Sequence, residues 1–125
     1  MGYDLPAAIG ACVANNKKNT ICIAGDGSLM MNLQELQTLK HHNLPVKIFI
    51  LNNDGYSSIK QTQTNFFEGR NTGAGTNSGV SMPDFVKVGS AFDIKSIRLE
   101  SPNEIDNTIK DVLSTKGPVL CDVIV

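Results

Sequence analysis

Short apolar runs alternate with amphipathic segments along this 125-residue chain. Continuous apolar runs predict buried strands at residues 21–24, 46–51, 94–99 and 118–125. Apolar positions at helical spacing, with capping or proline starts, predict helices at about residues 6–14, 32–43, 57–65, 83–92 and 102–113. Because strand and helix alternate throughout, we expect a single α/β domain over residues 1–125, a three-layer parallel sheet with helices on both faces.

Three local patterns refine this prediction. The run from Ile21 to Ala24 lacks polar alternation, so both faces of that strand are expected to be covered. Asn32 and Glu35 have the spacing of a capping box, which predicts a helix start there. Residues 68–81 are rich in Gly, Asn, Ser and Thr, which indicates a mobile loop that orders over the site when cofactor or partner binds.

Charge and composition exclude several classes of partner. The formal charge of −1, from 11 basic and 12 acidic residues, shows no footprint for nucleic acid or a membrane surface. No apolar segment approaches the roughly 20 residues of a membrane helix. Cys12, Cys22 and Cys121 are odd in number and widely spaced, which indicates buried thiols in a reducing cytoplasm.

The chain ends abruptly on both sides. A predicted helix begins almost at Met1, and the last residues lie inside an apolar run. Complete domains more often have polar, frayed ends. We therefore expect an N-terminally truncated piece of a longer protein.

Polar segments follow the first two predicted strands. Gly25-Asp26-Gly27-Ser28 follows the first, and Asn52-Asn53-Asp54-Gly55 follows the second. Ligands of open parallel sheets bind beyond the carboxyl ends of the strands, where these segments should lie. The glycines allow close approach of an anion, and the N–H groups of Gly27 and Ser28 and the Ser28 hydroxyl suit phosphate oxygens.

Asp26 would repel a phosphate unless a divalent cation lay between them. Mg²⁺ prefers octahedral oxygen ligands, commonly one or two protein groups with substrate phosphates and water. The Asp26 carboxylate, the Asn53 amide oxygen and the Gly55 carbonyl would supply three ligands, and two diphosphate oxygens and a water would complete the shell. Each segment alone is more often an ordinary turn, but the two together follow strands of one β-α-β unit.

These motifs resemble a known family. G-D-G-S, the 24 residues from Ser28 to Leu51, and then N-N are similar to the cofactor signature of thiamin-diphosphate-dependent enzymes. M-G-Y-D-L-P-A-A-I-G-A at the start and S-T-K-G-P-V-L near the end resemble the acetolactate synthase branch. The resemblance covers nearly the whole chain, and it implies the C-terminal domain that binds the diphosphate and Mg²⁺.

The resemblance implies roles for individual residues. Asp26, Asn53 and the Gly55 carbonyl match the metal ligands. Met1 matches a large apolar residue under the bend of the cofactor, although it is equally an initiator methionine. The implied thiamin diphosphate contacts are Met1, Gly25, Asp26, Gly27, Ser28, Asn53, Gly55 and Tyr56. The candidate substrate-pocket residues are Ser58, Ile59 and Thr62.

The implied reaction is decarboxylation of a 2-keto acid with carboligation, and two departures keep alternatives open. Thr62 replaces a tryptophan and Ser58 a methionine that are typical of biosynthetic acetohydroxyacid synthases. Asn53-Asp54-Gly55-Tyr56 instead resembles pyruvate decarboxylase relatives, yet Ile59 replaces their catalytic glutamate. The alternatives are a 2-keto acid decarboxylase domain and a non-catalytic module for cofactor binding or assembly.

The family's activating glutamate has no counterpart in this chain. In the family it belongs to a pyrimidine-binding domain of the same or another subunit. The resemblance therefore implies no catalytic residue here, an inactive isolated chain, and a homo-oligomeric full-length enzyme.

Overall fold

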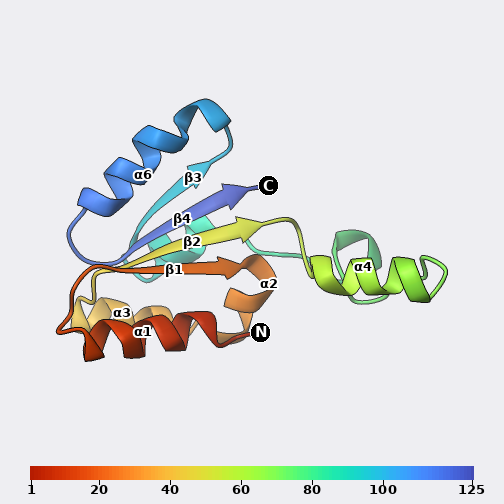
Figure 1. Cartoon of the computed structure of the whole chain (residues 1–125), viewed down its shortest axis with the longest axis horizontal. Helices are drawn as coiled ribbons and strands as arrows, with labels where there is room; N and C mark the ends of the chain where they lie inside the picture. The colour runs from red at the N-terminus through yellow and green to blue at the C-terminus, as the bar shows by residue number, and fades with distance from the viewer.

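Four parallel strands form one sheet in the order β1-β2-β4-β3 (Figure 1). The computed structural model describes residues 1–125. The strands are β1 (Thr20–Gly25), β2 (Val46–Asn52), β3 (Lys95–Leu99) and β4 (Val119–Ile124). All three strand pairs are parallel, so the predicted parallel sheet is confirmed.

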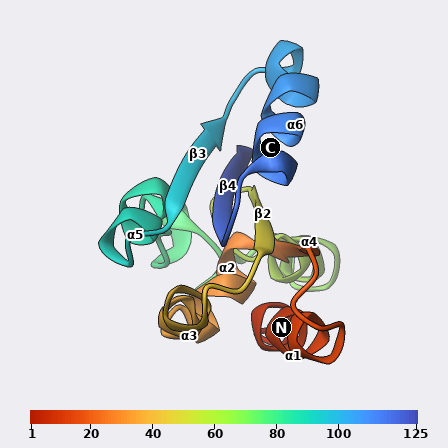
Figure 2. The ribbon, with the colours of Figure 1, turned by 90° about the vertical axis from the view of Figure 1, so that its left-hand side faces the viewer.

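Helices cover both faces of the sheet, as predicted. They are α1 (Asp4–Ala14), α2 (Asp26–Leu29), α3 (Glu35–His42), α4 (Ser57–Phe66), α5 (Phe85–Ala91) and α6 (Ile105–Ser114), with 3-10 turns η1 (Met30–Asn32), η2 (Thr76–Ser78) and η3 (Pro102–Glu104). Side chains of α1, α3 and α5 share one core cluster with the sheet, and α6 closes a smaller cluster on the other face. Figure 2 shows α6 across the sheet from α3 and α5.

Strand β1 lies at an edge, and the expectation that both its faces are covered is wrong. Cys22 and Ala24 are buried, whereas Ile21 is 55% and Ile23 66% exposed. The isoleucines are in register with Lys47 and Phe49 of β2, on the face that α6 covers. Because the cluster that α6 closes extends from β3 and β4 only as far as Phe49 of β2, this face of β1 has no covering helix.

The predicted capping box at Asn32 and Glu35 is also wrong. The chain is already helical through α2 and η1, and the residue before α3, Gln34, has helical backbone angles and no side-chain cap. Asn32 instead donates its side-chain amide to the Gly2 carbonyl. A tertiary contact with the N-terminus therefore replaces the local cap.

The three cysteines are free and buried, as predicted. Burial raises the pKa of the Cys22 and Cys121 thiols from 9.0 to about 11. Between about pH 9 and 11 the unfolded chain therefore binds fewer protons than the folded protein, so these thiols lower stability as pH rises.

The double variant Cys22→Ala/Cys121→Ala tests this effect of the thiols. Urea denaturation at a series of pH values measures the free energy of unfolding, which should fall less between about pH 9 and 11 in the variant than in the wild type. An equal fall in the two proteins would contradict this assignment.

Candidate functional site

The carboxyl ends of β1 and β2 lie side by side. Gly25, the last residue of β1, is in register with Leu51 of β2. The predicted turn after β1 is in fact a helix start, because Gly25 is extended and α2 begins at once with Asp26. After β2, Asp54 and Gly55 both have positive φ, 59° and 131°, and turn the chain back toward α2.

Asp26 joins the two polar segments. Its side chain is buried, with 1% of the residue exposed. One carboxylate oxygen accepts a hydrogen bond from the Gly27 N–H at 2.7 Å, and the other accepts from the Gly55 N–H at 2.8 Å. A carboxylate has about four acceptor positions, so both oxygens keep the capacity to bind a cation.

Asn53 supplies an unpaired acceptor beside this carboxylate. Its Oδ1 is buried and has no hydrogen-bond partner. Buried polar atoms are nearly always paired, so an orphan of this kind calls for an explanation. Asn53 and Asp26 line the same cavity, which makes a cation between them the simplest partner for the Asn53 oxygen.

The cavity at the strand ends has a volume of about 160 Å³. Its lining residues are Met1, Gly25, Asp26, Gly27, Ser28, Asn53, Gly55, Tyr56, Ser57, Ser58 and Ile59. The structure thus brings together all the candidate cofactor contacts and two of the three substrate-pocket candidates. Thr62 does not line the cavity; it is exposed one turn further along α4, where its hydroxyl donates to the Ser58 carbonyl at 2.9 Å.

The electrostatics of this cavity favour a cation. Asp26 is its only charged side chain, and no lysine, arginine or histidine lines it. An anionic ligand would therefore meet a buried carboxylate with no basic side chain to offset it. No group of three or more His, Cys, Asp or Glu side chains in the chain could hold a metal, so a metal here needs amide, carbonyl or ligand oxygens as well.

Gly27 lets the two segments approach closely. A Cβ on Gly27 would lie 2.3 Å from Cε1 of the Tyr56 ring, which packs directly against its backbone. Any side chain at this position would push Tyr56 away. The second glycine of the G-D-G motif is therefore required by packing as well as by access of a ligand.

Ser28 connects the site to the N-terminus, which lies beside α2 in Figure 1. Its Oγ accepts a hydrogen bond from the Gly2 N–H at 2.7 Å. The hydroxyl proton has no acceptor in the structure and can donate to a ligand oxygen. Met1 is 69% exposed at the rim of the cavity.

The loop at residues 68–81 packs against the polar segment that follows β2. Gly75 forms an antiparallel bridge with Gly55, and the Tyr56 N–H donates to the Ala74 carbonyl at 2.8 Å. None of the loop residues lines the cavity. Neither this bridge nor the lining residue Ser57 was predicted from the sequence, where Gly75 was the only signal for the bridge.

Comparison with protein families agrees with this geometry. Residues 1–123 match the family model described as thiamine pyrophosphate enzyme, C-terminal TPP binding domain. The chain belongs to this family. Its cavity therefore lies in a thiamin-diphosphate-binding domain, and the fold and the family predicted from the motifs are both confirmed.

Similar proteins are acetolactate synthases. The chain is 43% identical over 125 residues to an acetolactate synthase large subunit of Cyanidium caldarium, covering 100% of this chain and 21% of that protein. It is 42% identical over 122 residues to a probable acetolactate synthase large subunit of Methanococcus aeolicus, covering 98% of this chain and 20% of that protein. It is 43% identical over 125 residues to the mitochondrial acetolactate synthase of Schizosaccharomyces pombe, covering 100% of this chain and 18% of that protein. The chain thus spans about a fifth of the length of the curated relatives it matches.

Localisation is not decided by these relatives. Their names include mitochondrial and chloroplastic forms, so a cytoplasmic location stays a prediction. None of the helices in this family member has the length and apolar character needed to cross a membrane.

Proposed function

We propose that the cavity at the ends of β1 and β2 holds Mg²⁺ and the diphosphate of thiamin diphosphate. The observation that carries this proposal is the unpaired, buried Oδ1 of Asn53, a residue that lines the same cavity as Asp26. A cation ligated by both groups would pair the orphan oxygen and offset the carboxylate. The family assignment supports the diphosphate of the cofactor as the anion.

Each group at the site has a role in this proposal. Asp26, Asn53 and the Gly55 carbonyl are the metal ligands. The Ser28 hydroxyl is proposed to face diphosphate oxygens. The Gly27 N–H is engaged by the Asp26 carboxylate, so Gly27, like Gly25, contributes by leaving room for the diphosphate to approach. Tyr56 and Met1 border the remainder of the cofactor. Mg²⁺ accepts an oxygen set of this kind when phosphate oxygens and water complete it.

The enzyme to which this domain contributes is proposed to be acetolactate synthase-like and to act on a 2-keto acid by decarboxylation and carboligation. The identity of 40–43% to acetolactate synthases supports this substrate class. Thiamin diphosphate, when bound, supplies the carbanion chemistry, and the residues of this chain bind and orient it. Ser58 and Ile59 are proposed to contact substrate because they line the same cavity.

The proposal includes partners that complete the site. A pyrimidine-binding domain, of the same or another subunit, would provide the activating glutamate. The chain alone would then bind at most the diphosphate half of the cofactor and be inactive. A homo-oligomer is the expected assembly of the full-length protein.

Magnesium-dependent cofactor binding tests the proposed function. We expect calorimetric titration of thiamin diphosphate into the protein expressed from its complete native reading frame to show binding with Mg²⁺ and none after EDTA treatment. Thiamin monophosphate is the matched control, and it should bind weakly because it lacks the second phosphate. Binding that is indifferent to EDTA, or absent altogether, would refute the magnesium-diphosphate site.

The product formed from a 2-keto acid distinguishes carboligation from simple decarboxylation. With pyruvate as the simplest 2-keto acid, carboligation yields acetolactate, whereas simple decarboxylation yields acetaldehyde. Acetolactate is the expected product. Acetaldehyde alone would support the decarboxylase alternative, and cofactor binding without turnover would support the non-catalytic module.

A further inference from the structure

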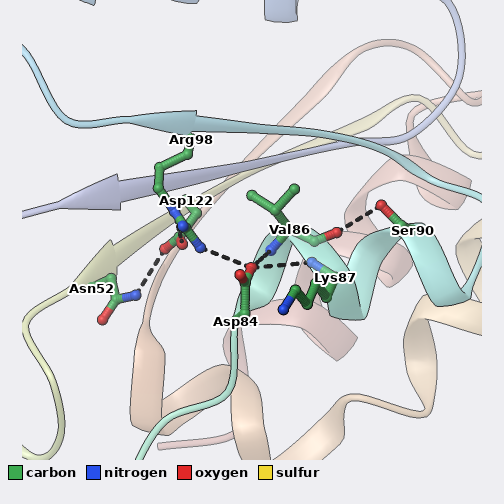
Figure 3. A network of polar contacts seen from close by, with 7 residues as sticks. All are labelled: Asn52, Asp84, Val86, Lys87, Ser90, Arg98 and Asp122. Atoms are coloured by element: carbon green, nitrogen blue, oxygen red, sulfur yellow. Dashed lines mark hydrogen bonds and ion pairs between the residues drawn. The ribbon is translucent and has the colours of Figure 1, made fainter.

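Asp122 of β4 is a fully buried carboxylate in a polar network that includes Asn52, the residue before the proposed ligand Asn53 (Figure 3). One of its oxygens accepts a hydrogen bond from the Asn52 side-chain amide at 2.9 Å. The other accepts from Nε of Arg98 at 3.2 Å. A carboxylate accepts hydrogen bonds through both of its oxygens. Asparagine has one accepting oxygen, and its NH₂ group would face the second donor.

Asn52 directly precedes Asn53 and is held at both ends. Its side-chain amide donates to Asp122, and its side-chain oxygen accepts from the Asp54 N–H at 3.3 Å. Its carbonyl accepts from the Val125 N–H at 3.0 Å. The backbone on both sides of the proposed ligand Asn53 is therefore fixed through Asn52.

Arg98 continues the network to the start of α5. One guanidinium nitrogen donates to Asp84 at 2.7 Å, and Asp84 caps α5 by accepting from the Val86 and Lys87 N–H groups. The hydrogen bond to Asp122 raises the pKa of Arg98, and the Lys87 N–H lowers the pKa of Asp84. The Arg98 guanidinium is thus paired with two carboxylates, Asp84 and Asp122.

Burying the Asp122 carboxylate is a costly way to stabilise a strand, since the side chain of its partner Arg98 is 36% exposed. Asp122 lies between Cys121 and Val123 in an otherwise apolar segment, and apolar residues in such positions are often as stable as an ion pair or more so. Stabilising the strand therefore does not explain the buried Asp122 carboxylate. Among its contacts, the hydrogen bond from Asn52 connects it to the proposed metal site, because Asn52 directly precedes Asn53.

We propose that Asp122 is a positioning residue that acts through Asn52. It holds the Asn52–Gly55 segment so that the Asn53 and Gly55 oxygens face Mg²⁺. This inference rests on the proposed magnesium-diphosphate function. Groups of this kind around a metal site orient the ligands without touching the metal.

The test is the Mg²⁺ affinity of the protein from its complete native reading frame, at saturating thiamin diphosphate. Asp122→Asn should raise the apparent Kd for Mg²⁺ by about 10–100-fold, as loss of an outer-shell partner typically does. Asn52→Ala should have a similar effect. The double variant should lose little more than the larger single loss, because both changes break one contact.

Val119→Ala is the matched control, since it truncates a buried residue of the same strand in the smaller core cluster. It should leave the Kd for Mg²⁺ within about threefold of the wild-type value, because Val119 is distant from the Asn52–Gly55 segment along the chain and belongs to a cluster that includes none of its residues. A second readout needs no cofactor. Amide hydrogen exchange at Asp54 and Gly55 should be faster in Asp122→Asn than in Val119→Ala when the two are compared at equal global stability.

The possible outcomes separate the two proposals. Unchanged Mg²⁺ affinity in Asp122→Asn, or additive losses in the double variant, would overturn the positioning role while the proposed function stands. A wild-type protein that binds no Mg²⁺ with thiamin diphosphate would overturn the function first. If Asp122→Asn does not fold, Asn52→Ala decides alone: a Kd within about threefold of wild type overturns the role.

Discussion

Asp26→Asn is expected to weaken Mg²⁺-dependent thiamin diphosphate binding by more than about 100-fold, beyond the usual cost of losing an outer-shell partner. The substitution keeps the size of the side chain and removes its charge. Asp26 accepts from the Gly27 and Gly55 N–H groups through its two oxygens. Asparagine would present an NH₂ group to one of these donors. The negative charge would then be lost, together with one of the two hydrogen bonds through which this side chain links the polar segments.

Stability should fall as well. Leaving one buried N–H donor without an acceptor costs about 1–3 kcal/mol. Urea denaturation measures this loss, and calorimetry measures cofactor binding in the same preparation. The two readouts separate a binding defect from unfolding, because binding is assayed where the variant is folded.

Asp54→Asn is the control within the second segment. Asp54 is exposed, accepts from the Thr76 hydroxyl at 2.7 Å and does not line the cavity. The same chemical change there should alter cofactor affinity by less than about threefold, as expected at an exposed position. Equal Mg²⁺ dependence in Asp26→Asn and wild type would show that the Asp26 carboxylate is not a metal ligand.

Gly55→Ala is expected to lower the free energy of unfolding by about 3 kcal/mol, the upper end for a residue forced into a sparsely populated backbone region. Gly55 has φ of 131°, which side-chain-bearing residues rarely adopt. A Cβ there would lie 2.4 Å from the Ala74 carbonyl oxygen, a backbone atom that cannot turn aside. The bridge to Gly75 must therefore open, and the Gly55 N–H would leave Asp26.

Cofactor binding should weaken together with stability in this variant, because the Gly55 carbonyl and Asp26 both move. Gly73→Ala, in the loop at residues 68–81 that packs against Gly55, is the control: its φ is 62°, and no atom lies within 4 Å of the added Cβ. It carries only the cost of a left-handed backbone, about 1–2 kcal/mol, and should bind cofactor normally. Equal binding losses in the two variants would argue against the steric explanation.

Much of the fold was predictable because its signals are local. Continuous apolar runs marked the strands, and the expected helix after β2 matched α4 closely. The meeting of Asp26 with Asn53 and Gly55 was also predictable, since neighbouring parallel strands end at the same edge. The family motifs then indicated which ligand these groups would hold.

Long-range contacts explain the errors. Exposure of Ile21 and Ile23 depends on where α6 lies, more than 80 residues along the chain. Lys47, inside an apolar run, is fully buried because its ammonium donates to the Thr115 and Gly117 carbonyls. Thr62 does not line the cavity, because α4 carries it one turn beyond Ser58, and its role in a substrate pocket stays a prediction.

The succession of strands and helices, the two polar segments and the chemistry they favour follow from the sequence alone, because apolar period and residue type are local properties. Three features are visible only in the folded chain: Asp26 bridges both segments, the Asn53 oxygen is buried without a partner, and Asp122 accepts a hydrogen bond from Asn52. These features depend on contacts between residues that are about 30 to 70 positions apart. Such contacts leave no pattern in any single segment, since each exists only once the sheet has aligned its strands.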